Sequence, residues 1–330
     1  MDFRLTDDQR ALRRGVRALL EGRFGREALR AALDRADGKG AAAGKGVSDG
    51  KGASDGKEGT DGRRRGDGRV LDRGLWRELG AAGFFALRLP EDGGGAGQGL
   101  PEAVLAFEEA GRVLLPGPLI ATHLAAGTVA GAATGEAVVT SADGGLVEWL
   151  DEADVVLGDA AGAEPLAPVD PLTPVHRLPA TAGRGAARTP EGLLVSLLSA
   201  AEQLGSAART CEIATQHART REQFGRPVGA FQAVQHLCAD MLVRVESARA
   251  AVYAASVTAD PVDIAAARLL ADEAAVRGAR DCLQVHGGMG FTWESDVHLH
   301  LKRAWTRTHR AGGATRSEEE LAEDLLSGAG

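Results

Sequence analysis

Three things are scarce in this sequence: cysteine, an excess of basic charge, and long apolar runs. Only three of the 330 residues are cysteines, namely Cys211, Cys238 and Cys282. They lie in Ala-rich stretches of helical character and show no CxxC or Cys/His spacing. We therefore expect buried free thiols of a reducing compartment, with no disulfide framework and no metal site.

The charge balance is acidic, with 38 Lys and Arg against 46 Asp and Glu and a net charge of −8. An extended phosphate-binding surface normally appears as a basic excess, so this balance argues against a nucleic-acid partner. It leaves open a local cluster of cations that binds one small anionic molecule.

Long apolar runs are missing from the N-terminal stretch "MDFRLTDDQRALRRGVRALL", where acids and arginines recur with a helical period. This pattern predicts neither a signal peptide nor a membrane span, and we expect a cytoplasmic location. The 44% hydrophobic content over this length predicts a globular protein of two or three structural units.

The pattern of apolar residues, Gly and Pro along the chain predicts a mainly α fold with a small β middle domain. Helical patterns occupy an N-terminal domain at 1–130, short β-branched runs between Gly and Pro mark a middle unit at 131–190, and three long Ala/Leu-rich segments predict a helical bundle at 191–330.

One segment interrupts the N-terminal domain. Residues 38–68 repeat Gly, Ser, Asp and Lys with almost no apolar side chains, which predicts a disordered insert. The alternative is a polyanion-binding tail that uses the arginines at 63–65, but interleaved Asp residues argue against it.

The stretch "QVHGGMGFTW", at 284–293, crowds three glycines between helical segments. A phosphate, another subunit or a plain helix end could each require such a cluster. A nicotinamide-binding fingerprint is excluded, because its glycines follow a strand, whereas here a helix precedes them.

A second polar turn, "HARTREQFGRPVGAFQAVQH", places Arg219, Arg221 and Arg226 between two predicted helices. On its own, such a cluster is more often a solvated helix end than a binding site.

Together these two turns resemble the C-terminal bundle of the acyl-CoA dehydrogenase family. The resemblance extends to "FRLTDDQRALRRGVRALL", "LWRELGAAGFFALRLPEDGGGAGQGL" and "EEAGRVLLPGPLIATHL" near the N-terminus. It implies an N-terminal helical domain, a middle β-barrel and a C-terminal four-helix bundle. The family's usual barrel motif is missing here, so we expect a trimmed barrel.

The resemblance also implies FAD as cofactor. In the family, the "RxQFG" turn and the "QxHGGxG" turn meet the FAD pyrophosphate and adenosine across a subunit interface. Carried over to this sequence, the cofactor-binding residues are Arg221, Gln223, Phe224, Gln284, Gly287 and Gly288. An Arg fork and close backbone N–H groups suit two phosphate charges.

The family's reaction is α,β-desaturation of an acyl-CoA thioester, in which a carboxylate removes the α-proton. The usual position of this glutamate is occupied here by Ala311. In a second arrangement within the family the glutamate lies on the first bundle helix, and this chain has Val195 at that position. The nearest acid is Glu202, a weak candidate base, for which the alternative is a helix glutamate that faces solvent or an interface.

These departures resemble short family members that work as one subunit of a heteromeric dehydrogenase, with the base supplied by a partner chain. The resemblance therefore implies an acyl-CoA substrate, bulky acyl groups included, a homo- or hetero-oligomer with another acyl-CoA dehydrogenase-like chain, and an electron-transfer flavoprotein or similar acceptor. The alternative is a non-catalytic structural or regulatory subunit of the same fold.

Overall fold

The computed structural model describes residues 5–43, 70–143, 145–179, 189–310 and 313–327. Of the segment predicted to be disordered, residues 44–68 lie outside this range. Residues 38–43 continue helix α2, so the helical pattern extends further into the segment than its composition predicts.

Helices form the N-terminal part of the chain, and polar side chains cap two of them. Thr6 and Gln9 close a capping box before the first helix, and Asp72 accepts two backbone N–H groups at the start of the third. The helices are α1 (Asp7–Arg23), α2 (Arg26–Ala43), α3 (Arg73–Ala81), α4 (Leu100–Arg112) and α5 (Leu119–Ala125), with a 3-10 turn η1 (Glu91–Gly93).

The middle unit is a sheet of five short strands, which confirms the small β domain. Its order is β3-β1-β2-β5-β4, with β1 and β3 parallel and the other pairs antiparallel. The strands are β1 (Val139–Asp143), β2 (Leu146–Glu148), β3 (Val155–Leu157), β4 (Glu164–Leu166) and β5 (Val175–Arg177), with a 3-10 turn η2 (Leu150–Glu152).

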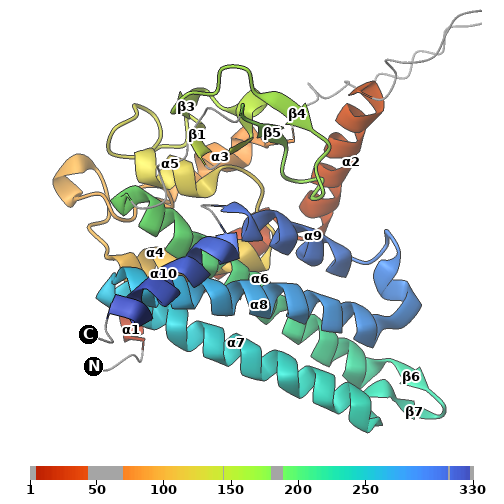
Figure 1. Ribbon diagram of the computed structural model, residues 1–330. Coiled ribbons are helices and arrows are strands. Elements are labelled where there is room, and N and C mark those ends of the chain that lie inside the picture. The colour runs from red at the N-terminus through yellow and green to blue at the C-terminus, as the bar shows by residue number, and fades with distance from the viewer. Residues whose placement is uncertain (1–4, 44–69, 144, 180–188, 311–312, 328–330) are drawn as a thin grey trace, which may run out of the picture.

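Three long helices form the C-terminal part, as predicted. In Figure 1 they run beside one another below the sheet, and two shorter helices lie against them. The helices are α6 (Pro190–Thr220), α7 (Gln232–Thr258), α8 (Pro261–His286), α9 (Val297–Thr308) and α10 (Gly313–Ser327); between them lie strands β6 (Glu222–Gln223) and β7 (Arg226–Pro227) and the turns η4 (Val228–Ala230) and η5 (Gly287–Phe291).

The backbones of helices α4 and α6 are in contact at two glycines. A Cβ on Gly205 would lie 1.8 Å from the carbonyl oxygen of Glu108, and a Cβ on Gly111 would lie 2.0 Å from that of Glu202. Because neither position has room for a methyl group, this contact fixes the N-terminal helices against the bundle.

The cysteines only partly match their prediction. All three are free thiols, but Cys282 alone is buried, whereas Cys211 and Cys238 are half-buried. Among the described residues, none of the helices combines the length and apolar character that crossing a membrane requires.

Candidate functional site

The two polar turns singled out in the sequence meet at one end of the bundle. The last turn of α6 lies against the last turn of α8, where the rings of His217 and His286 stack with centroids 4.0 Å apart. The β6–β7 hairpin follows α6 directly and η5 follows α8, so both turns project from this end (Figure 1).

Arg221 ends helix α6 with its guanidinium in solvent. Its backbone N–H donates to the carbonyl of His217 at 2.8 Å, and its own carbonyl accepts from the N–H of Val228 at 2.7 Å. These bonds fix the backbone, while the exposed guanidinium has no partner among the described residues. The side chain is therefore a cation on a rigid base, free to bind an anion.

The hairpin holds Phe224 out into solvent. Phe224 and Gly225 form its two-residue turn, with φ of 55° and 77°. A turn with positive φ at both central residues favours Asn-Gly, so a phenylalanine there is strained. Phe224 is 92% exposed, and its ring stands at right angles to that of Phe231, with ring centroids 6.0 Å apart. An apolar side chain held in this way is suited to contact another molecule.

The glycine turn ends α8 and leaves its backbone open. Gly287 has a φ of 61° and a ψ of −144°, a conformation nearly restricted to glycine. A Cβ on Gly287 or Gly288 would meet no atom within 4 Å, so the space beside them is free. Gln284 is exposed beside them. The helix-end interpretation of this cluster is therefore correct, and the open backbone is also compatible with an approaching ligand.

Glu202, the candidate base, is buried instead of facing solvent or an interface. Its side chain points from α6 toward two arginines that lie on or just after α9. Its Oε2 atom accepts from Arg310 Nη1 at 2.8 Å and lies 3.0 Å from Arg307 Nε. The second contact lacks hydrogen-bond alignment and is a simple ion pair.

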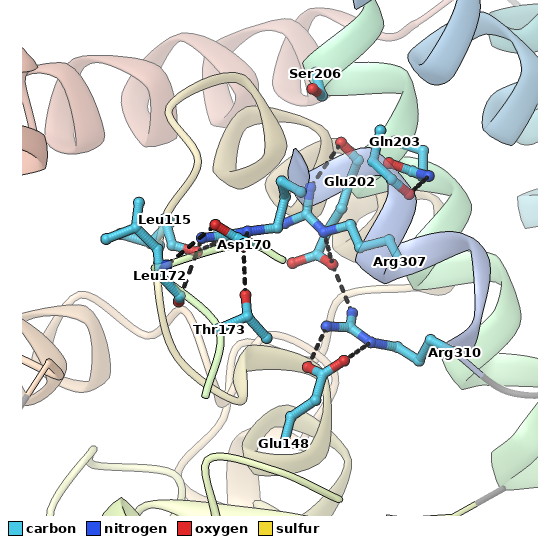
Figure 2. A network of polar contacts seen from close by, with 12 residues as sticks. Leu115, Glu148, Asp170, Leu172, Thr173, Glu202, Gln203, Ser206, Arg307 and Arg310 are labelled. Carbon is cyan, nitrogen blue, oxygen red and sulfur yellow. Dashed lines mark hydrogen bonds and ion pairs between the residues drawn. The ribbon is translucent and has the colours of Figure 1, made fainter. Parts of the chain in front are cut away.

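The arginines link Glu202 to the middle sheet. Arg310 donates through Nη2 to Glu148 on β2 at 2.6 Å, so its guanidinium lies between two carboxylates, as Figure 2 shows. Burial lowers the pKa of Arg307 to about 10, which leaves the group charged at neutral pH. Ala311, the position expected to carry the usual base, lies outside the described residues.

A small cavity lies beside this network, between α5, the sheet and α6. Ile120, Val175 and Val195 line it together with Thr140 and Arg310. Its volume is about 80 Å³. Pockets that bind small molecules usually measure roughly 300–1,000 Å³.

Comparison with known proteins decides the family. Residues 61–137 match the family model "Acyl-CoA dehydrogenase, N-terminal domain", and residues 183–320 match "Acyl-CoA dehydrogenase, C-terminal domain". The chain belongs to the acyl-CoA dehydrogenase family. It is therefore an acyl-CoA dehydrogenase-type oxidoreductase of a family that depends on FAD.

Curated relatives agree with this placement. Acyl-CoA dehydrogenase IpdE2 of Mycobacterium tuberculosis is 38% identical over 287 residues, which cover 78% of this chain and 86% of the relative. Acyl-CoA dehydrogenase FadE34 of the same organism is 35% identical, covering 73% of this chain but 40% of that longer protein.

Solved structures share the whole fold. A chain of the ChsE4-ChsE5 complex from Mycobacterium tuberculosis superposes with a TM-score of 0.76 at 25% identity, covering 99% of both chains. A steroid acyl-CoA dehydrogenase, Tcur3481-Tcur3483, gives 0.75 at 23% identity, covering 98% of this chain and 99% of that one.

The ionic network was missed in the sequence, although it left a signal. Arg303, Arg307 and Arg310 follow one another at spacings of four and three, which places them on one side of α9 and the turn after it. Arg303 pairs with buried Asp170, and the other two pair with Glu202. Arginines that share one side of a helix packed inside the protein need acidic partners, so this spacing predicts buried acids opposite them.

Proposed function

We propose that this chain is one subunit of a heteromeric FAD-dependent acyl-CoA dehydrogenase whose catalytic base comes from a partner chain. The observation that carries the proposal is the double ion pair of Glu202. This carboxylate pairs with Arg307 and Arg310 inside the protein, and moving it toward a substrate would leave Arg307 without its acidic partner, which is costly. We therefore assign Glu202 a structural role.

The cofactor residues fit the phosphate part of FAD. Arg221 offers free donors on a fixed backbone, Gly287 and Gly288 leave open space beside their backbone, and Gln223 and Gln284 are exposed. This arrangement suits a pyrophosphate, which needs a cation and a backbone that it can approach closely. When bound, FAD supplies the hydride acceptor for the desaturation.

Distance along α6 supports an assembled site. Arg221 follows Glu202 by nineteen residues, so the two lie about 28 Å apart along the helix axis at 1.5 Å per residue. The phosphate-binding turns of this chain are therefore remote from its own base region. A cofactor held at Arg221 suits a site completed by a neighbouring chain, in keeping with the similarity to one chain of a two-protein complex.

Flavin binding tests the cofactor assignment. Replacing Arg221 with Ala is expected to weaken FAD binding about 10- to 150-fold, the effect of losing a charge-assisted bond of roughly 1.5–3 kcal/mol. Arg219→Ala, which removes a neighbouring exposed cation, is the matched control. Unchanged FAD affinity in a folded Arg221→Ala protein contradicts the assignment.

Activity assays test the missing base. The isolated chain is expected to be nearly inactive against acyl-CoA thioesters, since a missing general base costs roughly 10²- to 10⁴-fold. Co-expression with a dehydrogenase-like partner is expected to restore turnover to an electron-transfer flavoprotein or a similar acceptor. Robust activity of the isolated chain that disappears in Glu202→Gln would show that Glu202 is the base.

The small cavity also favours a second function, a non-catalytic subunit that stabilises a true dehydrogenase. The two functions differ in flavin content. If Arg221→Ala leaves the FAD affinity of the purified chain or complex unchanged, the structural role is supported. If Arg221→Ala loses flavin, the catalytic assembly is supported.

A further inference from the structure

A single arginine joins three parts of the fold beside the small cavity. Arg310, just after α9, binds Glu148 on β2 and Glu202 on α6 through separate nitrogen atoms. We call these three residues the Glu148–Arg310–Glu202 bridge. Figure 2 shows the guanidinium between the two carboxylates, with Glu148 reaching it from the sheet side and Glu202 from the bundle side.

The bridge is charged and mostly buried. Burial alone would lower the pKa of Arg310, but Glu148 and Glu202 together raise it above its ordinary value. Arg307, which also pairs with Glu202, holds that carboxylate from a second direction. Breaking the bridge would leave a partly buried guanidinium or carboxylate unpaired, so it resists opening.

The bridge limits a cavity whose lining otherwise suits an acyl group. Ile120, Val175 and Val195 supply apolar surface, while Arg310 and Glu148 form a charged wall. At about 80 Å³ the space is well below the size of ordinary ligand pockets. An acyl chain would have to displace the guanidinium or lie against it, and both are unfavourable for apolar carbon.

We infer that Arg310 excludes the acyl group from this chain's own site, so that in an assembled dehydrogenase the acyl-CoA binds only in the partner's site. This inference rests on the proposed function. Beyond that function, it names Arg310 as the residue that decides which of the two similar chains accepts the substrate. Arg310 directly precedes Ala311, so the change that blocks the site lies next to the change that removes the expected base.

The inference is tested with the full-length chain by comparing two probes, hexanoyl-CoA and CoA, in isothermal titration calorimetry. Wild-type protein is expected to bind hexanoyl-CoA no more tightly than CoA, because the hexanoyl group finds no pocket. Arg310→Ala is expected to bind hexanoyl-CoA at least about tenfold more tightly than CoA, since two or more methylenes become buried. Arg316→Ala, which breaks the surface pair with Glu320 on α10, is the control and is expected to leave the ratio at one.

Two further variants keep the test decisive. Arg310→Met removes the charge but keeps most of the bulk and is expected to give a smaller gain, and Glu148→Gln weakens the bridge from the sheet side without touching α6. The inference is wrong if wild-type protein already binds hexanoyl-CoA more tightly than CoA. It is also wrong if Arg310→Ala, Arg310→Met and Glu148→Gln all fold and all bind the two probes with equal affinity. The probe ratio does not depend on flavin, so its failure is distinct from a failure of the Arg221 test.

Discussion

At the scale of single residues, the end of the bundle that carries both polar turns has side chains that the fold holds in place without covering them. Phe224 is the plainest example, since a strained hairpin turn keeps its ring 92% exposed. Strain and exposure both cost stability, and they are retained where a surface has to meet another molecule.

Replacing Phe224 with Asn is expected to stabilise the isolated chain by about 1 kcal/mol, because Asn adopts positive φ readily and Asn-Gly suits this turn. The same change is expected to weaken FAD binding or partner association. Urea unfolding and FAD titration measure the two effects. Phe224→Leu keeps the strain and is expected to bring no gain in stability; an equal gain in both variants contradicts the argument.

Two buried histidines make stability depend on pH. Burial, with Arg88 nearby, lowers the pKa of His123 to about 4, and burial, with Arg209 and other arginines nearby, lowers that of His300 to about 3. Both rings are hydrogen-bonded through Nδ1, to the carbonyl of Phe85 and to the hydroxyl of Ser206. The unfolded chain takes up protons on both from about pH 6.5 downward, while the folded chain does not.

The free energy of unfolding is therefore expected to be at its full value above about pH 6.5 and to fall as the pH drops toward 4, by roughly 1.4 kcal/mol per pH unit for each histidine. Urea unfolding at pH 7, 6 and 5 measures this slope. His123→Asn and His300→Asn are each expected to flatten it, and His236→Asn, on the exposed side of α7, is expected not to. Identical slopes in all variants would refute the assignment.

At the scale of elements, the contact between α4 and α6 positions the ionic network. Gly111 lies against the backbone of Glu202, so the distance between the two helices fixes the point from which this side chain reaches Arg307 and Arg310. The bridge to β2 then ties the same segment of α6 to the sheet.

Gly205→Ala is expected to destabilise the protein by at least about 2 kcal/mol, because its Cβ would overlap the carbonyl oxygen of Glu108 at 1.8 Å. Gly15→Ala is the matched control: it lies within α1 with no atom within 4 Å and is expected to stabilise by up to about 1 kcal/mol. Urea denaturation measures both. Similar stability of the two variants would show that the helices can move apart at little cost.

At the scale of the whole molecule, large apolar side chains remain exposed at the end that carries both turns. Besides Phe224, Met289, Phe291 and Trp293 are exposed on or near η5. Such a group of apolar side chains is usually covered by a ligand or another chain. This agrees with the proposed assembly, in which the turns of one chain meet a cofactor shared with its partner.

Residues 44–60 lie outside both family matches and contain almost no apolar side chains. Deleting them is expected to leave the melting temperature and FAD affinity unchanged, since their composition offers little to bury. A deletion of equal length within α7 serves as the disruptive control. A marked loss of thermal stability on deleting 44–60 would show that the segment packs against the fold.

The sequence by itself determined the order of the helical and β units and the two turns at the end of the bundle. These follow from local signals: the helical period of apolar residues, caps such as Thr6, and glycines where a helix must end. The family was indicated by the resemblance of the motifs in those turns. The tertiary structure alone decided the surroundings of Glu202. Whether a helix glutamate is exposed, catalytic or ion-paired depends on what lies opposite, and here Arg307 and Arg310 arrive from more than a hundred residues away. Local sequence fixes the backbone pattern of a helix, but the charge environment of a buried side chain is set by elements that only folding brings together.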